Sequence, residues 1–170
     1  GGWAGGAGAS VVVGCGVVGL VRVEASDVTG SRSGYGRTKR AGEQAVQSLL
    51  PSSWVVRTAW LYGAGGPNFV KTMASLEKSR ETVSVVSDQV GSPTWAGDLA
   101  RGLLALARSS PPFGVYHGTN RGSTSWFGFE QAIFAALGAD PSRVLPIGSA
   151  DFVQAAPRPS YSVLSGSSWD

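Results

Sequence analysis

Apolar and polar positions alternate along this chain with two different periods. Residues 36–50 place their apolar side chains near one face of a helix, and Pro51 ends it because proline cannot continue a helix. Residues 54–60 are mostly apolar and β-rich, as in a buried strand of a parallel sheet. Similar patterns predict helices at 69–76, 98–106 and 126–137, strands at 82–86 and 114–117, and a short extended piece at 143–147. Alternating strands and helices predict an α/β fold.

The first 22 residues are rich in Gly, Ala and Val, and their first charge comes at Arg22. Residues 14–19 read G-x-G-x-x-G after three valines, which formally matches a dinucleotide-binding loop. However, Asp27 comes too early for the ribose-binding acid, and only 34 residues precede Tyr35, whereas a full dinucleotide site uses two βαβαβ halves. We therefore interpret 14–19 as a chance match, and we expect neither a signal peptide nor a membrane span in this stretch.

Composition and charge narrow the class of protein. Of the 170 residues, 42% are hydrophobic and 15% are charged, which is typical of a globular protein. The net charge of +3 comes without a dense Lys/Arg cluster, so we expect no nucleic-acid partner, whereas a phosphate-bearing small substrate fits. The single cysteine, Cys15, excludes an internal disulfide and predicts a reducing, cytoplasmic compartment.

Candidate chemistry begins with Tyr35 and Lys39, which are four residues apart in the first predicted helix. At that spacing two side chains share one helical face. Free tyrosine has a pKa of about 10, and a nearby ammonium stabilises the phenolate and lowers that pKa toward the working range. The pair could therefore act as a general acid for a carbonyl being reduced, or as a base for an alcohol being oxidised. The alternative interpretation is an aromatic residue at a helix start followed by a solvated lysine.

Further motifs follow this helix in a fixed order. They lie at 35–43, 56–63, 68–70, 88–94, 98–100, 114–117 and 158–164. In this order, and from about residue 24 to residue 169, the chain resembles the dTDP-4-dehydrorhamnose reductase family of extended short-chain dehydrogenases. The resemblance implies a partial Rossmann-like, doubly wound sheet joined to a small α/β region that binds a nucleotide sugar.

The resemblance also implies a reaction. Members of the family use NADPH or NADH to reduce the 4-keto group of dTDP-4-dehydro-rhamnose, which gives dTDP-rhamnose. By this resemblance Tyr35 donates the proton to the forming alkoxide, and Lys39 lowers the pKa of Tyr35 and holds the nicotinamide ribose. The family's upstream Thr or Ser, which hydrogen-bonds the carbonyl oxygen, has no counterpart here, because residues 26–29 lie too close to Tyr35.

Six more residues are implied to contact the substrate, and no metal ligand is implied. Trp60 would lie near the sugar or the nicotinamide, where its aromatic face can stack, and Arg158 would pair with the diphosphate. The implied substrate-binding set is Trp60, Asn68, Gln89, Ser92, Thr94 and Arg158. Structural interpretations compete with these roles, such as helix capping by Asn68 and turn formation by the loop at 88–94. His117, the only histidine, is interpreted as structural.

We expect two regions in the chain. Residues 1–22 form an unmatched segment that is either disordered or read in a shifted frame. A frame shift is an option because the residue types of this segment have G+C-rich codons. Residues 23–170 form a reductase-like C-terminal portion. The family's cofactor half is expected to be largely missing, so little activity is expected from this chain unaided, and a homodimer is a possible assembly. Two other functions stay open: a non-catalytic member like the regulatory subunit of methionine adenosyltransferase, and a related nucleotide-sugar epimerase or dehydratase.

Overall fold

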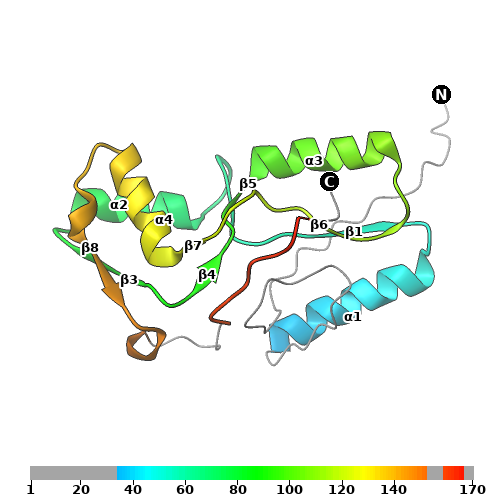
Figure 1. The fold of residues 1–170 in the computed structure, drawn as a ribbon, viewed down its shortest axis with the longest axis horizontal. Helices are drawn as coiled ribbons and strands as arrows, with labels where there is room; N and C mark the ends of the chain where they lie inside the picture. The colour runs from blue at the N-terminus through cyan, green and yellow to red at the C-terminus, as the bar shows by residue number, and fades with distance from the viewer. Residues whose placement is uncertain (1–33, 153–158, 167–170) are drawn as a thin grey trace.

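The computed structural model describes residues 34–152 and 159–166, and their arrangement confirms the α/β fold (Figure 1). The described elements, in chain order, are α1 (Gly34–Leu49), β1 (Trp54–Arg57), β2 (Leu61–Tyr62), α2 (Phe69–Ser79), β3 (Val83–Val86), β4 (Val90–Gly91), β5 (Thr94–Trp95), α3 (Ala96–Ser109), β6 (Gly114–His117), β7 (Thr124–Ser125), α4 (Trp126–Ala136), η1 (Pro141–Arg143), β8 (Val144–Ile147) and η2 (Ser149–Asp151). The N-terminal segment 1–33 and the segments 153–158 and 167–170 lie outside this description.

One end of the molecule is built on the parallel pair β1 and β6. Their register runs from Trp54 opposite Gly114 to Arg57 opposite His117. Figure 1 shows α3 on one side of this pair and α1 on the other. Because successive side chains of a strand point to opposite faces, Trp54 and Val56 pack together against Leu106 of α3. The result is a three-layer arrangement of helix, strands and helix.

The other end of the molecule is built on the parallel pair β3 and β8, which α2 and α4 cover (Figure 1). The buried core here consists of Val83, Val85, Phe134 and Val144. Asn68 begins α2 by accepting a hydrogen bond from Lys71 N at 3.1 Å, and Ser125 begins α4 in the same way from Gly128 N at 3.0 Å. Both predicted helices are therefore confirmed, and in each a side-chain cap explains the residue at which the helix begins.

Short strands connect the two ends. β2 pairs with β5 in parallel, β4 pairs with β7 in antiparallel orientation, and Val90 forms an isolated parallel bridge with Tyr161. These two-residue strands were not predicted, because each is held only by a partner distant in the sequence. The predicted strand at 54–60 was too long: β1 ends at Arg57, and Trp60 has a φ of 48°, in the left-handed region that an extended strand excludes.

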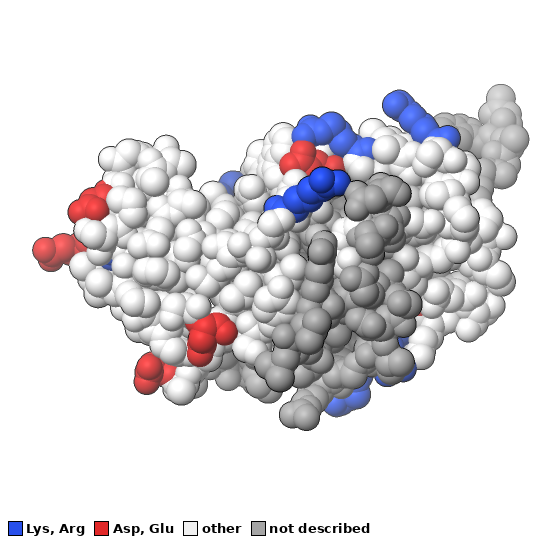
Figure 2. Space-filling view, in the orientation of Figure 1, with Lys and Arg blue, Asp and Glu red and all other residues white. Residues whose placement is uncertain are grey.

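Charged side chains are unevenly distributed on the face drawn in Figure 2. Acidic side chains lie mainly over the end that carries α2 and β8, and Lys and Arg lie mainly over the end that carries α3. Within the described residues, no helix has the length and apolar character needed to cross a membrane.

Candidate functional site

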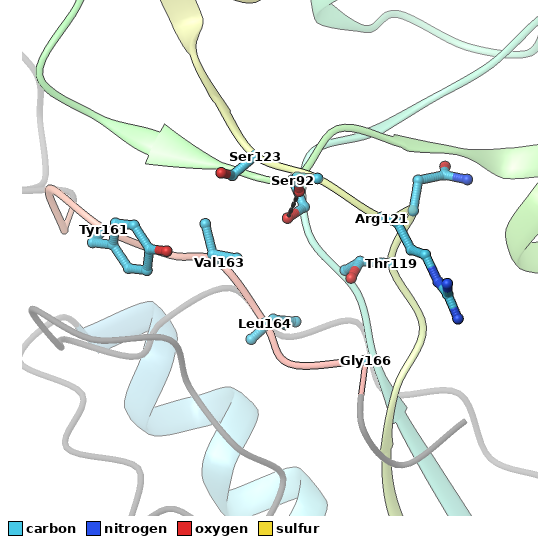
Figure 3. A pocket seen from close by; sticks show the side chains of 10 residues that line it. Ser92, Thr119, Arg121, Ser123, Tyr161, Val163, Leu164 and Gly166 are labelled. Carbon is cyan, nitrogen blue, oxygen red and sulfur yellow. Dashed lines mark hydrogen bonds between the residues drawn. The ribbon is translucent and has the colours of Figure 1, made fainter. Parts of the chain in front are cut away.

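The main candidate site is a pocket of about 420 Å³ beyond the carboxyl ends of β1 and β6 (Figure 3). Ligands of open α/β sheets bind in the crevice outside the carboxyl ends of the strands. The pocket is lined by Ser92, Thr119, Asn120, Arg121, Gly122, Ser123, Tyr161, Val163, Leu164 and Gly166. A second hollow of about 220 Å³ shares Thr119, Asn120, Arg121 and Gly166, and Thr94 and Asp98 extend it toward α3.

The loop after β6 gives the pocket its polar wall, and side-chain hydrogen bonds hold this loop in place. Ser92 Oγ donates to the carbonyl of Gly122 at 2.8 Å. Asn120 accepts from Trp95 N at 2.7 Å and donates to Asp98 Oδ2, also at 2.7 Å. Because two neighbouring segments fix the loop, it has little conformational freedom left to lose when a ligand binds.

The opposite wall comes from the C-terminal segment 159–166. Val90 of β4 receives a backbone hydrogen bond from Ser162 at 2.8 Å and donates one to Ser160 at 2.8 Å. Farther along, His117 Nδ1 lies 3.1 Å from the carbonyl oxygen of Ser165. This pairing places Tyr161 in the wall of the pocket, and Figure 3 shows it on the same segment as Val163 and Leu164. His117 is fully buried, as its structural interpretation requires.

The predicted dyad lies on α1, and one of its two side chains is described. Lys39 is half-buried, and the side chain of Tyr35 lies outside the described residues, although its backbone belongs to α1. Glu43, one turn after Lys39, makes a bidentate ion pair with Arg57 at the end of β1. Arg57 Nε donates to Oε1 at 3.1 Å and Nη2 donates to Oε2 at 2.9 Å, and both side chains are buried. This pair fixes the helix that carries the dyad to β1, the strand that pairs with β6.

Trp60 is held between two other segments of the chain. Its indole stacks on Trp126 with centroids 3.6 Å apart and an interplanar angle of 9°. It also lies so close to Gly91 that a Cβ added there would be 2.4 Å from Cε2 of the indole. Trp60 is not among the residues that line the two hollows; it packs against the buried pair Ala59 and Leu164, and Leu164 lines the main pocket.

The remaining predicted substrate contacts fall into two groups. Ser92 lines the main pocket and Thr94 the adjoining hollow. Asn68 and Gln89 instead make local structural bonds: Asn68 Nδ2 donates to the carbonyl of Gly63 at 2.8 Å, and Gln89 Nε2 donates to Ser149 Oγ at 2.9 Å. Arg158 lies outside the described residues.

Sequence reasoning missed five pocket residues with polar side chains. Thr119, Asn120, Arg121 and Ser123 lie in the loop after β6, and Tyr161 lies in the C-terminal segment. The position of the first four was available from the sequence, because a polar loop directly after a predicted parallel strand belongs to the ligand-binding edge of the sheet. The position of Tyr161 could not be predicted in this way, since only its pairing with β4 brings it to this edge.

A carboxylate outside the lining of both hollows holds η2 in place. Asp88 accepts hydrogen bonds from Ser149 through the hydroxyl at 2.5 Å and the backbone N–H at 3.0 Å, and these bonds hold the pKa of Asp88 below its usual value. They connect η2 to the loop that contains Gln89. Within the described part of the chain, no group of three or more His, Cys, Asp or Glu side chains is placed to hold a metal ion.

Comparisons with known proteins show the family of this chain. A family model described as RmlD substrate binding domain matches residues 22–170. The chain is 53% identical over 146 residues to a dTDP-4-dehydrorhamnose reductase of Streptomyces griseus, a match that covers 83% of this chain and 48% of the relative. It is 50% identical over 141 residues to a probable dTDP-4,6-dihydroxy-2-methyloxan-3-one 4-ketoreductase of Streptomyces antibioticus, with the same coverage. The chain therefore spans about half the length of the curated relatives it matches.

Solved structures share the fold. The crystal structure of dTDP-4-dehydrorhamnose reductase from Bacillus anthracis in complex with NADP is similar with a TM-score of 0.87 and 39% identity, over 93% of this chain and 56% of that one. A dTDP-4-dehydrorhamnose reductase from Clostridium acetobutylicum is similar with a TM-score of 0.85 and 40% identity, over 94% of this chain and 56% of that one.

Proposed function

This chain belongs to the RmlD substrate binding domain family, and from that premise we propose that it provides the nucleotide-sugar site and the proton-donating dyad of an NAD(P)H-dependent dTDP-4-keto-sugar reductase. The main support for the proposal is the polar pocket beyond β1 and β6. An ion pair also joins β1 to the dyad helix, so the pocket and the dyad belong to one rigid arrangement. The reaction proposed is reduction of dTDP-4-dehydro-rhamnose to dTDP-rhamnose. A cytoplasmic location and a homodimer belong to the same proposal.

The proposed chemistry divides between the dyad and the pocket. A nicotinamide cofactor, when bound, supplies the hydride. Tyr35 gives its phenolic proton to the alkoxide oxygen that forms at the 4-keto group, and the ammonium of Lys39 stabilises the phenolate left behind. Of the described residues, Lys39 suits the hydroxyls of the nicotinamide ribose, because an ammonium donates hydrogen bonds in several directions. A glycine-rich loop for the pyrophosphate is not among the described residues.

The pocket suits the phosphorylated part of a nucleotide sugar. Arg121 brings a guanidinium, which matches the geometry of phosphate oxygens, while Thr119 and Ser123 bring hydroxyl groups. Arg158 is proposed to add a second guanidinium on the diphosphate, as the family resemblance implies. Trp60, Asn68, Gln89, Ser92 and Thr94 remain proposed substrate contacts, and for Asn68 and Gln89 these contacts are additional to the local bonds they make.

Binding of dTDP-glucose, a stable nucleotide sugar, tests the proposal by isothermal titration calorimetry. Arg121→Ala should weaken binding about tenfold or more, because it removes charged hydrogen bonds to phosphate. Arg108→Ala is the matched control, since this exposed arginine lies in the last turn of α3 outside the pocket lining, and its affinity should equal that of the unaltered chain. Absence of dTDP-glucose binding, or equal affinities for both variants, would refute the proposed site. Oxidation of NADPH in the presence of dTDP-4-dehydro-rhamnose then tests the reductase activity itself.

A further inference from the structure

The backbone of Trp60 adopts a conformation that needs support from its surroundings. A φ of 48° puts this bulky residue in the left-handed region, which costs free energy for any side chain other than glycine. The backbone after the turn is fixed, because Thr94 N donates to the carbonyl of Trp60 at 3.1 Å and β2 then pairs with β5. The turn sends the indole away from β1 toward α4 and β4.

Both faces of that indole are covered. A Cβ added to Gly91 would lie 2.4, 2.6 and 2.7 Å from Cε2, Nε1 and Cζ2, which are three consecutive atoms of the ring. This point lies over the ring face, because it is slightly farther from the two bonded neighbours than from Cε2. An approach in the plane of the ring, between Nε1 and Cζ2, would bring it closer to these neighbours than to Cε2. Trp126 covers a face of the same ring at 3.6 Å, so it takes the face opposite Gly91.

Trp126 is itself fixed from several sides. It is the first residue of α4, its backbone N donates to the carbonyl of Gln89 at 3.3 Å, and Ser125 caps the helix. Phe69 of α2 packs against it with centroids 4.5 Å apart. Through these contacts, the positions of α2 and α4 determine where Trp126 lies, and Trp126 in turn packs against Trp60, which follows β1.

We propose that Trp126 and Gly91 are positioning residues that enclose both faces of Trp60, so that Trp60 presents its edge, and not a stacking face, to the sugar of a bound nucleotide sugar. The proposal rests on the proposed function for the identity of the ligand. The proposed role of Trp126 requires an aromatic ring. The enclosure also explains the glycine at position 91 of β4, because a Cβ there would overlap the indole of Trp60.

Two readouts separate this role from a general contribution to folding. Stacked indoles give an exciton couplet in the far-ultraviolet circular dichroism spectrum, which reports the stack directly. Affinities for dTDP-glucose and for dTDP, both measured calorimetrically, separate contacts to the sugar from contacts to the nucleotide. Trp95→Phe is the matched control, because the ring of this tryptophan is exposed beside Arg101 and is not part of the Trp60–Trp126 stack.

We expect Trp126→Leu to abolish the couplet and to weaken dTDP-glucose binding about fivefold to tenfold while changing dTDP binding less than about twofold. Trp126→Phe should abolish the couplet, which needs two indoles, yet keep dTDP-glucose affinity within about twofold because a ring still covers the face. Gly91→Ala, which pushes the indole away, should behave like Trp126→Leu and provides a second variant if that one unfolds. Trp95→Phe should keep both the couplet and the affinities.

Two results would overturn the enclosure. One is a couplet that survives Trp126→Leu, and the other is an equal loss of affinity for dTDP and dTDP-glucose in Trp126→Leu or Gly91→Ala. If the unaltered chain binds neither ligand, the proposed function fails. The couplet and its response to the variants then still decide whether Trp126 and Gly91 hold Trp60.

Discussion

Replacing Glu130 with glutamine should remove most of the pH dependence of folding stability near neutrality. Glu130 is fully buried in α4, and among the described residues neither of its carboxylate oxygens has a hydrogen-bond partner. Burial of a charge without a partner disfavours the ionised form, and it raises the pKa of Glu130 from its ordinary value of 4.5 to about 7. The ionised carboxyl lowers the free energy of unfolding, and the size of this effect depends on pH because the group is protonated at low pH.

The sign of the pH effect follows from proton binding. As pH rises above 4.5 the unfolded chain releases the proton of Glu130, whereas the folded chain keeps it until about pH 7. The stability present at low pH therefore falls across this interval and levels off above it. The two pKa values differ by about 2.5, which corresponds to a loss of about 3 kcal/mol at about 1.4 kcal/mol per unit. This is a large share of the roughly 5–15 kcal/mol that stabilises a typical domain.

Urea unfolding at a series of values between about pH 4 and about pH 8.5 measures this loss. The unaltered chain should lose about 3 kcal/mol more than Glu130→Gln over the series. Glu81→Gln is the matched control, because Glu81 is exposed, and its pH profile should follow that of the unaltered chain. Parallel pH profiles for Glu130→Gln and the unaltered chain would refute the reasoning, since they would show that the buried carboxyl does not titrate in this range.

Three other substitutions have definite expected outcomes. Arg57→Met leaves Glu43 as an uncompensated buried charge, so urea unfolding should show a loss of about 3–5 kcal/mol, and adding Glu43→Gln should restore part of it. Asn68→Ala removes the cap of α2 and should cost about 1 kcal/mol in the same assay, whereas Asn68→Asp keeps the cap, loses the hydrogen bond to the carbonyl of Gly63, and should cost less than Asn68→Ala. Tyr35→Phe removes the proposed proton donor, so in any preparation that reduces the dTDP-4-keto sugar kcat should fall about a hundredfold or more, and an unchanged kcat would exclude the dyad.

The sequence predicted the long elements of this fold better than the short ones. The amphipathic pattern at 36–50 and the apolar run that starts at Trp54 depend on local periodicity, and both have counterparts in α1 and β1. The end of β1 was wrong because the left-handed turn at Trp60 is stabilised by Trp126 and Gly91, which are distant in sequence. Such turns cannot be recognised from propensity, since tryptophan itself favours strands.

Local patterns limited the predicted site in the same way. Ser92 and Thr94 belong to a continuous motif and both line the pockets, and their contacts with a substrate stay predictions. Tyr161 was missed because it reaches the pocket only through a bridge to Val90, a contact between residues that local patterns do not connect. The roles proposed for Tyr35 and Arg158 stay predictions, since their side chains lie outside the described residues.

The buried carboxyl and the tryptophan stack are connected through one helix. Glu130 follows Trp126 by four residues in α4, so their side chains share a helical face. Ionised Glu130 needs water or a donor, and among the described residues no donor is in place, so α4 must shift or open to solvate the charge. A shift of its first turn moves Trp126, and Trp126 holds one face of Trp60. The same protonation that stabilises the core therefore also keeps the indole in place. Core stability should fall between pH 4.5 and about 7, and the indole should move only as pH rises above about 7, where the folded chain itself releases the proton.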